Sequence, residues 1–375
     1  MINLFDEFDP VTSEEWLKKA TTDLKGENPL EKFKKELTST IFQVPYYDSS
    51  DLADIRKISI ADLLPDRPYD PWYTTEQIYV QSEKEANALA LNALNTGANC
   101  LHFISDMQHP DLKALLKNIK LPYCYISFEK FEKELLSGYL RKALSESNTE
   151  SLNISFLDSA TKPEFDHKVA KSLHQHGIKD ISLFVDQDHS SSLIKNLANQ
   201  LSLFVDIICD KNDENVQNLY DRLTIVNTCR NHYFLEIAKL RAIRILFSEV
   251  GGYFDLKSPK VFIQSFTATG EDQLENLLIN TTQAMSAVTG GTDALVITPH
   301  IKSPSDANEQ NFTSRIARNV SNLLEEESHL DKVKDPSAGS YYICSLTDQL
   351  VARTWEKFKE IEELGGFSKL QERIA

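Results

Sequence analysis

Three side chains that could act as general acids or bases directly follow short, β-rich apolar runs. Asp158 follows NISFL, Asp186 follows ISLFV, and His300 follows ALVITP. Carboxylates or an imidazole at neighbouring strand ends can exchange protons with a bound substrate. An aspartate at a strand end more commonly caps the helix that follows. We therefore expect no catalytic residue, and these three remain candidates for the alternative in which the chain is itself an enzyme.

A second group of candidates is cationic. Lys239, Arg241 and Arg244 lie in the segment LEIAKLRAIRILF, which is apolar around most of a helix circumference. Charges buried there must be neutralised by carboxylates, by carbonyl groups or by a bound anion. Internal ion pairs are the favoured interpretation, and a contact with a phosphate or coenzyme A is the alternative.

Motifs for several other chemistries are absent from the sequence. It contains no H-E-x-x-H, no G-x-S-x-G, no C-x-x-C and neither glycine-rich nucleotide motif. We therefore expect no bound metal and no cofactor held by this chain. The five cysteines are scattered along the sequence, which is typical of reduced thiols in a cytosolic protein.

Composition and charge limit the partners. The 56 acidic and 40 basic side chains give a formal net charge of −16, which argues against a protein that tracks nucleic-acid phosphates. The acidic start, MINLFDEFDP, lacks the basic patch and apolar run of a signal peptide. No apolar stretch approaches the roughly 18 residues that suggest a membrane span. We expect a cytoplasmic protein that binds neither nucleic acid nor membranes.

The elements that would position these side chains alternate regularly after about residue 71. The expected strands are 76–80, 100–105, 123–128, 153–158, 181–186, 203–209, 260–266 and 294–299. The expected helices are 83–94, 111–119, 130–144, 163–174, 191–201, one or two within 216–250, 271–288, 312–327 and about 346–364. Eight strand–helix units predict an α/β fold, a (β/α)₈ TIM barrel over residues 71–375, with a doubly wound open sheet as its competitor.

Residues 1–70 have a different character. Apart from one helix signal at 13–23, this segment is interrupted by prolines and carries aromatic side chains between them. It has too little periodicity to form a core of its own, and such aromatic residues are favoured at protein interfaces. We predict an extended N-terminal arm that wraps a partner subunit. The expected interface residues are Trp16, Leu17, Leu24, Phe42, Tyr46 and Tyr47.

Several ordered segments resemble the methylmalonyl-CoA mutase family. They are NHYFLEIAKLRA (231–242), TQAMSAVTGGTDAL (282–295), RIARN (315–319), LLEEESHL (323–330), DPSAGSYY (335–342) and IEELGGF (361–367). Near the N-terminus, FDPV (8–11), WLKKA (16–20) and DLKG (23–26) resemble the opening of the family's small subunit. The similarity spans nearly the whole chain and is strongest over residues 230–367.

This resemblance implies a fold and an activity. Family members have a (β/α)₈ barrel threaded by coenzyme A, followed by a flavodoxin-like cobalamin domain. The catalytic members interconvert (R)-methylmalonyl-CoA and succinyl-CoA through adenosylcobalamin radicals. Many bacterial forms are heterodimers whose smaller chain is inactive.

Departures from the family pattern point to that inactive chain. The Asp-x-His-x-x-Gly of the cobalamin domain is absent, and residues 205–210 stand where we expect the catalytic chain's Tyr-His pair after the sixth strand. Ile279-Asn280 replaces an Arg-Thr, and Arg67-Pro68-Tyr69 lies in a different local sequence from the family's Arg-Pro and substrate-facing Tyr. The resemblance therefore implies a small, non-catalytic subunit, with adenosylcobalamin in a large catalytic partner.

Two other functions stay open at this point. One is a catalytic acyl-CoA mutase barrel of another specificity that uses a separate cobalamin-binding protein, with Asp158, Asp186 or His300 as its reactive groups. The other is an acyl-CoA-binding or assembly protein. Whether the barrel still binds a CoA ester does not follow from the sequence.

Overall fold

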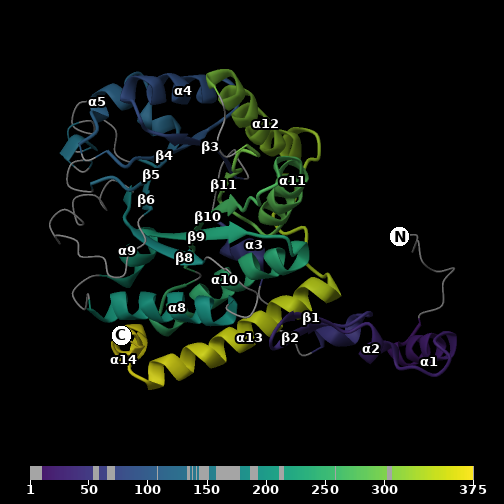
Figure 1. Ribbon diagram of the computed structural model, residues 1–375. Coiled ribbons are helices and arrows are strands. Elements are labelled where there is room, and N and C mark those ends of the chain that lie inside the picture. Colours follow the sequence, from purple (N-terminus) through teal and green to yellow (C-terminus); the bar gives the residue numbers. More distant parts are fainter. Residues whose placement is uncertain are drawn as a thin grey trace, which may run out of the picture.

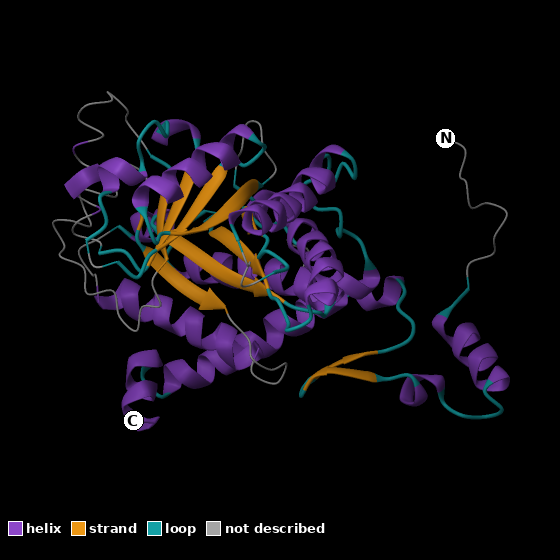
Figure 2. Cartoon of the chain, turned by 45° about the horizontal axis from the view of Figure 1, so that its top comes forward, coloured by secondary structure: helices purple, strands orange, loops and turns teal. Residues whose placement is uncertain are grey.

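The structure of the chain is a computed structural model. It describes residues 11–53, 59–65, 72–107, 109–132, 136, 138–140, 142, 152–157, 178–185, 193–210, 215–257, 259–301 and 306–374. Parallel strands form a ring at the centre of the molecule, and helices surround it (Figures 1 and 2). The first described helix of the chain, at residues 13–23, stands apart from this body in both views.

The ring contains nine strands in the order β7-β6-β5-β4-β3-β11-β10-β9-β8. They are β3 (Tyr73–Tyr79), β4 (Cys100–Ile104), β5 (Tyr125–Glu129), β6 (Ile154–Leu157), β7 (Ile178–Lys179), β8 (Ile181–Val185), β9 (Leu223–Cys229), β10 (Phe262–Thr267) and β11 (Ala294–Val296). Only Asp180 separates β7, which pairs with β6, from β8, which pairs with β9. These two strands are halves of one interrupted strand, so the ring closes as an eight-stranded parallel barrel, as predicted.

A buried ion pair holds the point of interruption. The Arg222 guanidinium donates from Nε and Nη2 to the two carboxylate oxygens of Asp180, at 2.6 Å each, and both side chains are 1% exposed. The backbone N–H of Ile181 also donates to the carbonyl of Arg222 at 3.1 Å. This two-point contact fixes β8 against the start of β9, because a planar guanidinium and a carboxylate fit in only one relative orientation.

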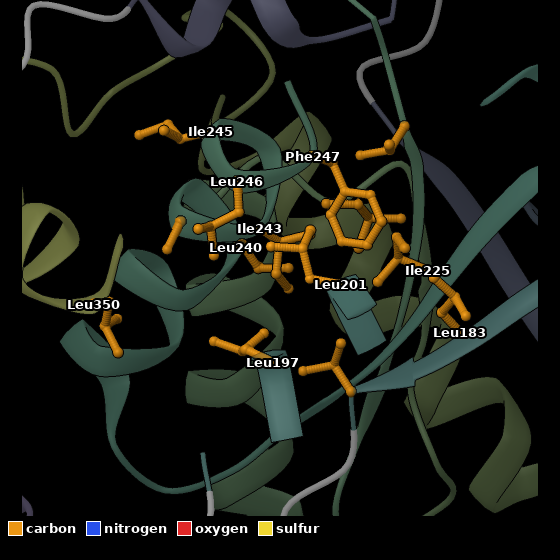
Figure 3. Packing of buried hydrophobic residues seen from close by; sticks show 14 of the residues in the cluster. Leu183, Leu197, Leu201, Ile225, Leu240, Ile243, Ile245, Leu246, Phe247 and Leu350 are labelled. Atoms are coloured by element: carbon orange, nitrogen blue, oxygen red, sulfur yellow. The ribbon is translucent and has the colours of Figure 1, made fainter. Parts of the chain in front are cut away.

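Helices cover the outer face of the barrel. They are α4 (Glu83–Asn95), α5 (Leu112–Leu115), α8 (Leu193–Asp210), α9 (Val216–Asp221), α10 (Tyr233–Tyr253), α11 (Gln273–Thr289), α12 (Ala307–Glu326), α13 (Tyr341–Glu363) and α14 (Gly366–Ile374). Two cores lie under them, one between α4, α5 and β3–β6, the other between α8, α10, α13 and β8–β10. Figure 3 shows the second core, where Leu197 and Leu201 of α8 lie among Leu183, Ile225 and Phe247.

The sixth predicted strand is wrong. Residues 203–209 belong to α8, and the strand in that place is β9, which the pattern assigned to a helical stretch. A short apolar run does not distinguish a strand from a helix that is buried on most sides. Leu193, Leu197, Leu201, Phe204 and Ile208 repeat at helical spacing and are all buried in α8. The β-branched residues of LTIVNTC were the signal for β9.

The other predicted elements vary in accuracy. The seven remaining strands, the helices at 83–94, 271–288 and 312–327, and the final helix lie within a few residues of their counterparts. The expected helix at 111–119 is only one turn, α5, because Asn118 takes a positive φ of 64°. The expected helix at 163–174 lies outside the described residues, as does part of 130–144.

The N-terminal segment contains α1 (Ser13–Asp23), α2 (Pro29–Lys32), a hairpin of β1 (Lys35–Thr38) and β2 (Ile41–Gln43), the short 3₁₀ helix η1 (Ser49–Leu52) and α3 (Ile60–Leu63). Helix α1 buries none of its residues. Leu37 and Ile41 of the hairpin and Ile60 and Leu63 of α3 instead belong to the core under α10 and α13. Among the described residues of the arm, α1 therefore contributes nothing to the barrel core.

Candidate functional site

The inside of the barrel, its lumen, is lined by every second residue of each strand. In β4, for example, Leu101 and Phe103 pack outward under the helices. His102, between them, contacts the ring of Phe266 in β10, a strand that is not its neighbour, with centroids 5.2 Å apart. Hydrogen bonds across the lumen connect Ser155 with Thr224 at 2.8 Å and Gln264 with Ser127 at 3.1 Å. The lumen is therefore polar in its middle and filled by its own side chains.

Aromatic rings close the amino-terminal end of the lumen. The first residues of five strands form one cluster there: Tyr73, Cys100, Tyr125, Phe262 and Ala294. Tyr125 and Phe262 stack with centroids 4.6 Å apart and planes 9° apart. Three strands separate β5 from β10 in the ring, so this stack spans the lumen. Burial raises the pKa of the Tyr125 phenol and of the Cys100 thiol, which keeps both groups neutral.

A hydrogen-bonded chain runs from the middle of the lumen to its carboxyl-terminal mouth. Gln264 Nε2 donates to Ser127 Oγ, and Ser127 Oγ lies 2.9 Å from His102 Nδ1. His102 Nε2 lies 3.2 Å from Glu129 Oε2. His102 is fully buried, whereas the Glu129 side chain is one third exposed. When Ser127 donates to Nδ1, the imidazole is in its neutral form, and its Nε2–H donates to the Glu129 carboxylate. A hydroxyl, an imidazole and a carboxylate connected in this way can transfer a proton.

This chain of polar groups was not predicted from the sequence. His102, Ser127 and Glu129 lie within strands, whereas the predicted candidates directly follow strands. The available signal was the alternation of polar and apolar residues in CLHFI and YISFE, since a strand covered by helices outside and open to a lumen inside must alternate.

The three strand-end candidates have different outcomes. Asp158 and Asp186 lie outside the described residues. His300 follows β11, and its Nδ1 lies 2.8 Å from the hydroxyl of Thr313 in α12. Its backbone carbonyl accepts from Asn276 at 3.2 Å. The described contacts thus connect His300 to α12 and α11.

A row of buried amides on α11 fixes the loops around the mouth. Gln283 accepts from the backbone N–H of Ala268 at 2.8 Å and donates to Asn231 at 2.9 Å. Asn280 donates to the carbonyl of Thr298 at 2.8 Å, and Asn276 accepts from Gly270 N at 2.7 Å. The spacing of four and three residues places these amides on one face of the helix. They join the segments that follow β9, β10 and β11.

The cations of α10 are used internally, as expected. Lys239 donates to the carbonyl of Thr228 at 2.8 Å and pairs with Glu236, and Arg241 pairs with Asp335. Arg244 donates to Asp293 and to the carbonyl of Val261, both at 2.9 Å.

A further buried ion pair joins α12 to β3. Arg318 of the RIARN segment pairs with Glu76 at 2.6 Å. Asp335, which neutralises Arg241, lies in DPSAGSYY, so this pair joins two of the segments that carry the family resemblance. Arg244, two residues after the first segment, pairs with Asp293 of TQAMSAVTGGTDAL. These basic side chains hold the fold together, and the favoured interpretation of internal ion pairs is confirmed.

The interface residues predicted for the arm are half-buried. Trp16 stacks on Tyr46 with centroids 4.6 Å apart, and Tyr47 contacts Tyr342 of α13 at 5.0 Å. The Lys34 ammonium lies 4.6 Å from the centre of the Phe42 ring. Leu17 and Leu24 are partly exposed on α1. Helix α1 therefore packs through Trp16 on the segment after the hairpin, and it leaves Leu17 and Leu24 partly exposed.

Three further observations concern the described parts of the chain. Among these residues, no three side chains of the metal-binding types converge. None of the described helices is long and apolar enough to cross a bilayer. All five cysteines are free thiols.

Comparison with known proteins places the chain among its relatives. Residues 204–373 match the family model described as methylmalonyl-CoA mutase. The chain is 31% identical to the methylmalonyl-CoA mutase small subunit of Porphyromonas gingivalis, over 98% of this chain and 66% of that protein. It is 34% identical to the small subunit of Propionibacterium freudenreichii subsp. shermanii, over 40% of this chain and 24% of that protein.

The chain is also similar to a methylmalonyl-CoA mutase large subunit. The chain is 35% identical to the large subunit of P. gingivalis, over 37% of this chain and 20% of that protein. It spans about two thirds of the first of these relatives and a quarter or less of the other two. With the closed eight-stranded barrel and the interlocked signature segments, these matches show that the chain belongs to the methylmalonyl-CoA mutase family.

Proposed function

We propose that this chain is the small, non-catalytic subunit of a heterodimeric, adenosylcobalamin-dependent methylmalonyl-CoA mutase. The holoenzyme would interconvert (R)-methylmalonyl-CoA and succinyl-CoA in the cytoplasm, as part of propionate metabolism. The large partner would carry the chemistry, and this chain would support it. Relatives named small subunit and large subunit give this proposal its context.

The observation that carries the proposal is the aromatic stack across the lumen. A barrel threaded by coenzyme A needs an open path along its axis, and here Tyr125 and Phe262 occupy that path, with Tyr73 packed against them. Interiors are close-packed, so displacing such rings has a large energetic cost. The family's basic signature residues are also committed to internal carboxylates. We therefore expect the chain to bind no CoA ester along its lumen.

The cofactor belongs to the partner in this proposal. Adenosylcobalamin in this family needs a histidine presented by Asp-x-His-x-x-Gly, which the sequence lacks. Both ring nitrogens of His102 lie within hydrogen-bond distance of side chains, and Nδ1 of His300 is bonded to Thr313. These described residues do not fit an axial ligand.

The test uses the purified chain and the large subunit. Alone, the chain should show no turnover of methylmalonyl-CoA with adenosylcobalamin and should retain no cobalamin absorbance after gel filtration. Mixed with the large subunit, it should form a 1:1 complex by light scattering. Turnover by the chain alone would instead favour the second candidate, a catalytic barrel that uses a separate cobalamin protein. The exposed edge of Glu129, backed by His102, is the observation in favour of that candidate.

A further inference from the structure

Exposed apolar side chains gather on the carboxyl-terminal side of four neighbouring strand–helix units. Phe234 is the second residue of α10 and is 47% exposed, and Leu274 is the second residue of α11 and is 78% exposed. Leu278 follows one turn later, at 73%. Phe312 of α12 and Tyr79, the last residue of β3, are 48% and 59% exposed. We call these five residues the mouth rim.

Topology places the mouth rim on one side of the barrel. Strands β9, β10, β11 and β3 are consecutive in the ring, and in a parallel barrel each following helix begins at the carboxyl-terminal face. Leu274 and Leu278 share one stripe of α11, because side chains four residues apart lie above one another. Exposed apolar groups that cluster in this way are typical of interaction surfaces.

The mouth rim is continuous with the base of the arm through a row of aromatic rings. Tyr47, after the hairpin, contacts Tyr342 with centroids 5.0 Å apart, and Tyr342 contacts Phe234 at 5.3 Å. These two contacts join Phe234 of the mouth rim to the segment that follows the hairpin. The border is acidic: Glu271, Asp272 and Glu275 flank Leu274 and are exposed.

We infer that the mouth rim is a second contact surface for the large mutase subunit, beside the arm. This inference rests on the proposed function and extends it. The surface of the large subunit that fits is apolar and bordered by Lys or Arg, which matches the acidic border and the net charge of −16.

The experiment measures binding of the large subunit by titration calorimetry. The double change Leu274→Asp and Leu278→Asp places two charges in the proposed contact, and burying them without partners is costly. We expect the dissociation constant to rise by at least about tenfold. The matched control is Tyr253→Asp at the opposite end of α10, where the tyrosine is 85% exposed, and it should change the constant less than about twofold.

Each outcome decides the inference. In one outcome, the double variant binds as tightly as the unmodified chain while Leu17→Asp in the arm weakens binding. That result would overturn the mouth rim as a contact surface and would leave the proposed function standing. No binding by the unmodified chain overturns both. A homodimer that the double variant dissociates shows that a second copy covers the rim, which also overturns the inference. If the double variant melts early, Phe312→Asp replaces it under the same criteria.

Discussion

Arg244 lies two residues after the signature segment 231–242, and its partner Asp293 lies in the segment 282–295. Arg244 is 1% exposed, and its guanidinium also donates to the carbonyls of Val261 and Gly291. Asp293 accepts in addition from the backbone N–H of Ile263 at 2.6 Å. The pair therefore binds α10 to the amino-terminal ends of β10 and β11. From the sequence, the need for an internal partner could be predicted, but the identity of that partner could not, because 49 residues separate the two.

Removing Arg244 should destabilise the fold. In Arg244→Met, the carboxylate of Asp293 stays buried without its cation, and breaking such a pair typically costs about 3–5 kcal/mol. Urea denaturation should show a loss of that size in the free energy of unfolding. The control is Arg353→Met, whose exposed pair with Glu356 at 3.2 Å should contribute less than about 1 kcal/mol. An Arg244 variant as stable as the control would instead indicate a ligand-binding arginine.

At the scale of elements, hydrophobic pattern predicted most of the barrel and failed in one place for a physical reason. Strands with both faces covered and a helix buried on most sides are both continuous apolar runs, so α8 was taken for a helix followed by a strand. The number of strands still came out right, because β9 was hidden in the next helical stretch. The lumen residues were not predicted because their partners lie on other strands, either on the neighbouring strand, as for His102 and Glu129, or across the lumen, as for Ser127 and Gln264.

The wrong prediction of a strand at residues 203–209 also affects one inference about the site. The absence of a Tyr-His pair was inferred at residues 205–210, which were placed after the sixth strand. Those residues lie inside α8, so they occupy no strand end. The proposal of a non-catalytic chain therefore depends on the filled lumen and on the missing cobalamin motif.

The structure also shows which residues of the arm can be deleted without removing part of the barrel core. Deleting residues 1–70 would remove Leu37, Ile41, Ile60 and Leu63 from the core and so destabilise the barrel. Deleting 1–27 removes α1, which buries none of its residues. We expect this shorter deletion to leave the melting temperature nearly unchanged and to weaken association with the large subunit by at least about tenfold.

Point variants in α1 provide the matched comparison for this deletion. Leu17→Asp should weaken the complex, whereas Lys18→Asp, at an exposed position beside it, should have little effect. Analytical gel filtration of the mixed subunits measures both. A complex that forms equally well with the 1–27 deletion would show that α1 is not part of the interface.

At the scale of the whole molecule, the chain forms a closed barrel whose axis is occupied by its own side chains. The lumen has a polar middle with cross-strand hydrogen bonds and an aromatic base, and both stabilise the ring from inside. Such a barrel can serve as a rigid support for a partner, since its outer helices and arm remain available for contact. This division of roles predicts that side chains at strand ends matter for stability more than for turnover.

The strand-end residues provide the test of that division. The triple variant Asp158→Asn, Asp186→Asn, His300→Ala should leave turnover of the reconstituted enzyme nearly intact if the chemistry lies in the large subunit, as we propose. Loss of a general acid or base lowers a rate by about 10²–10⁴-fold, whereas loss of a helix cap costs about 1 kcal/mol of stability. Steady-state turnover and thermal melting of the assembled complex separate the two. A drop of about 10²-fold with an intact complex and an unchanged melting temperature would assign catalysis to this chain, and single variants would then identify the residue.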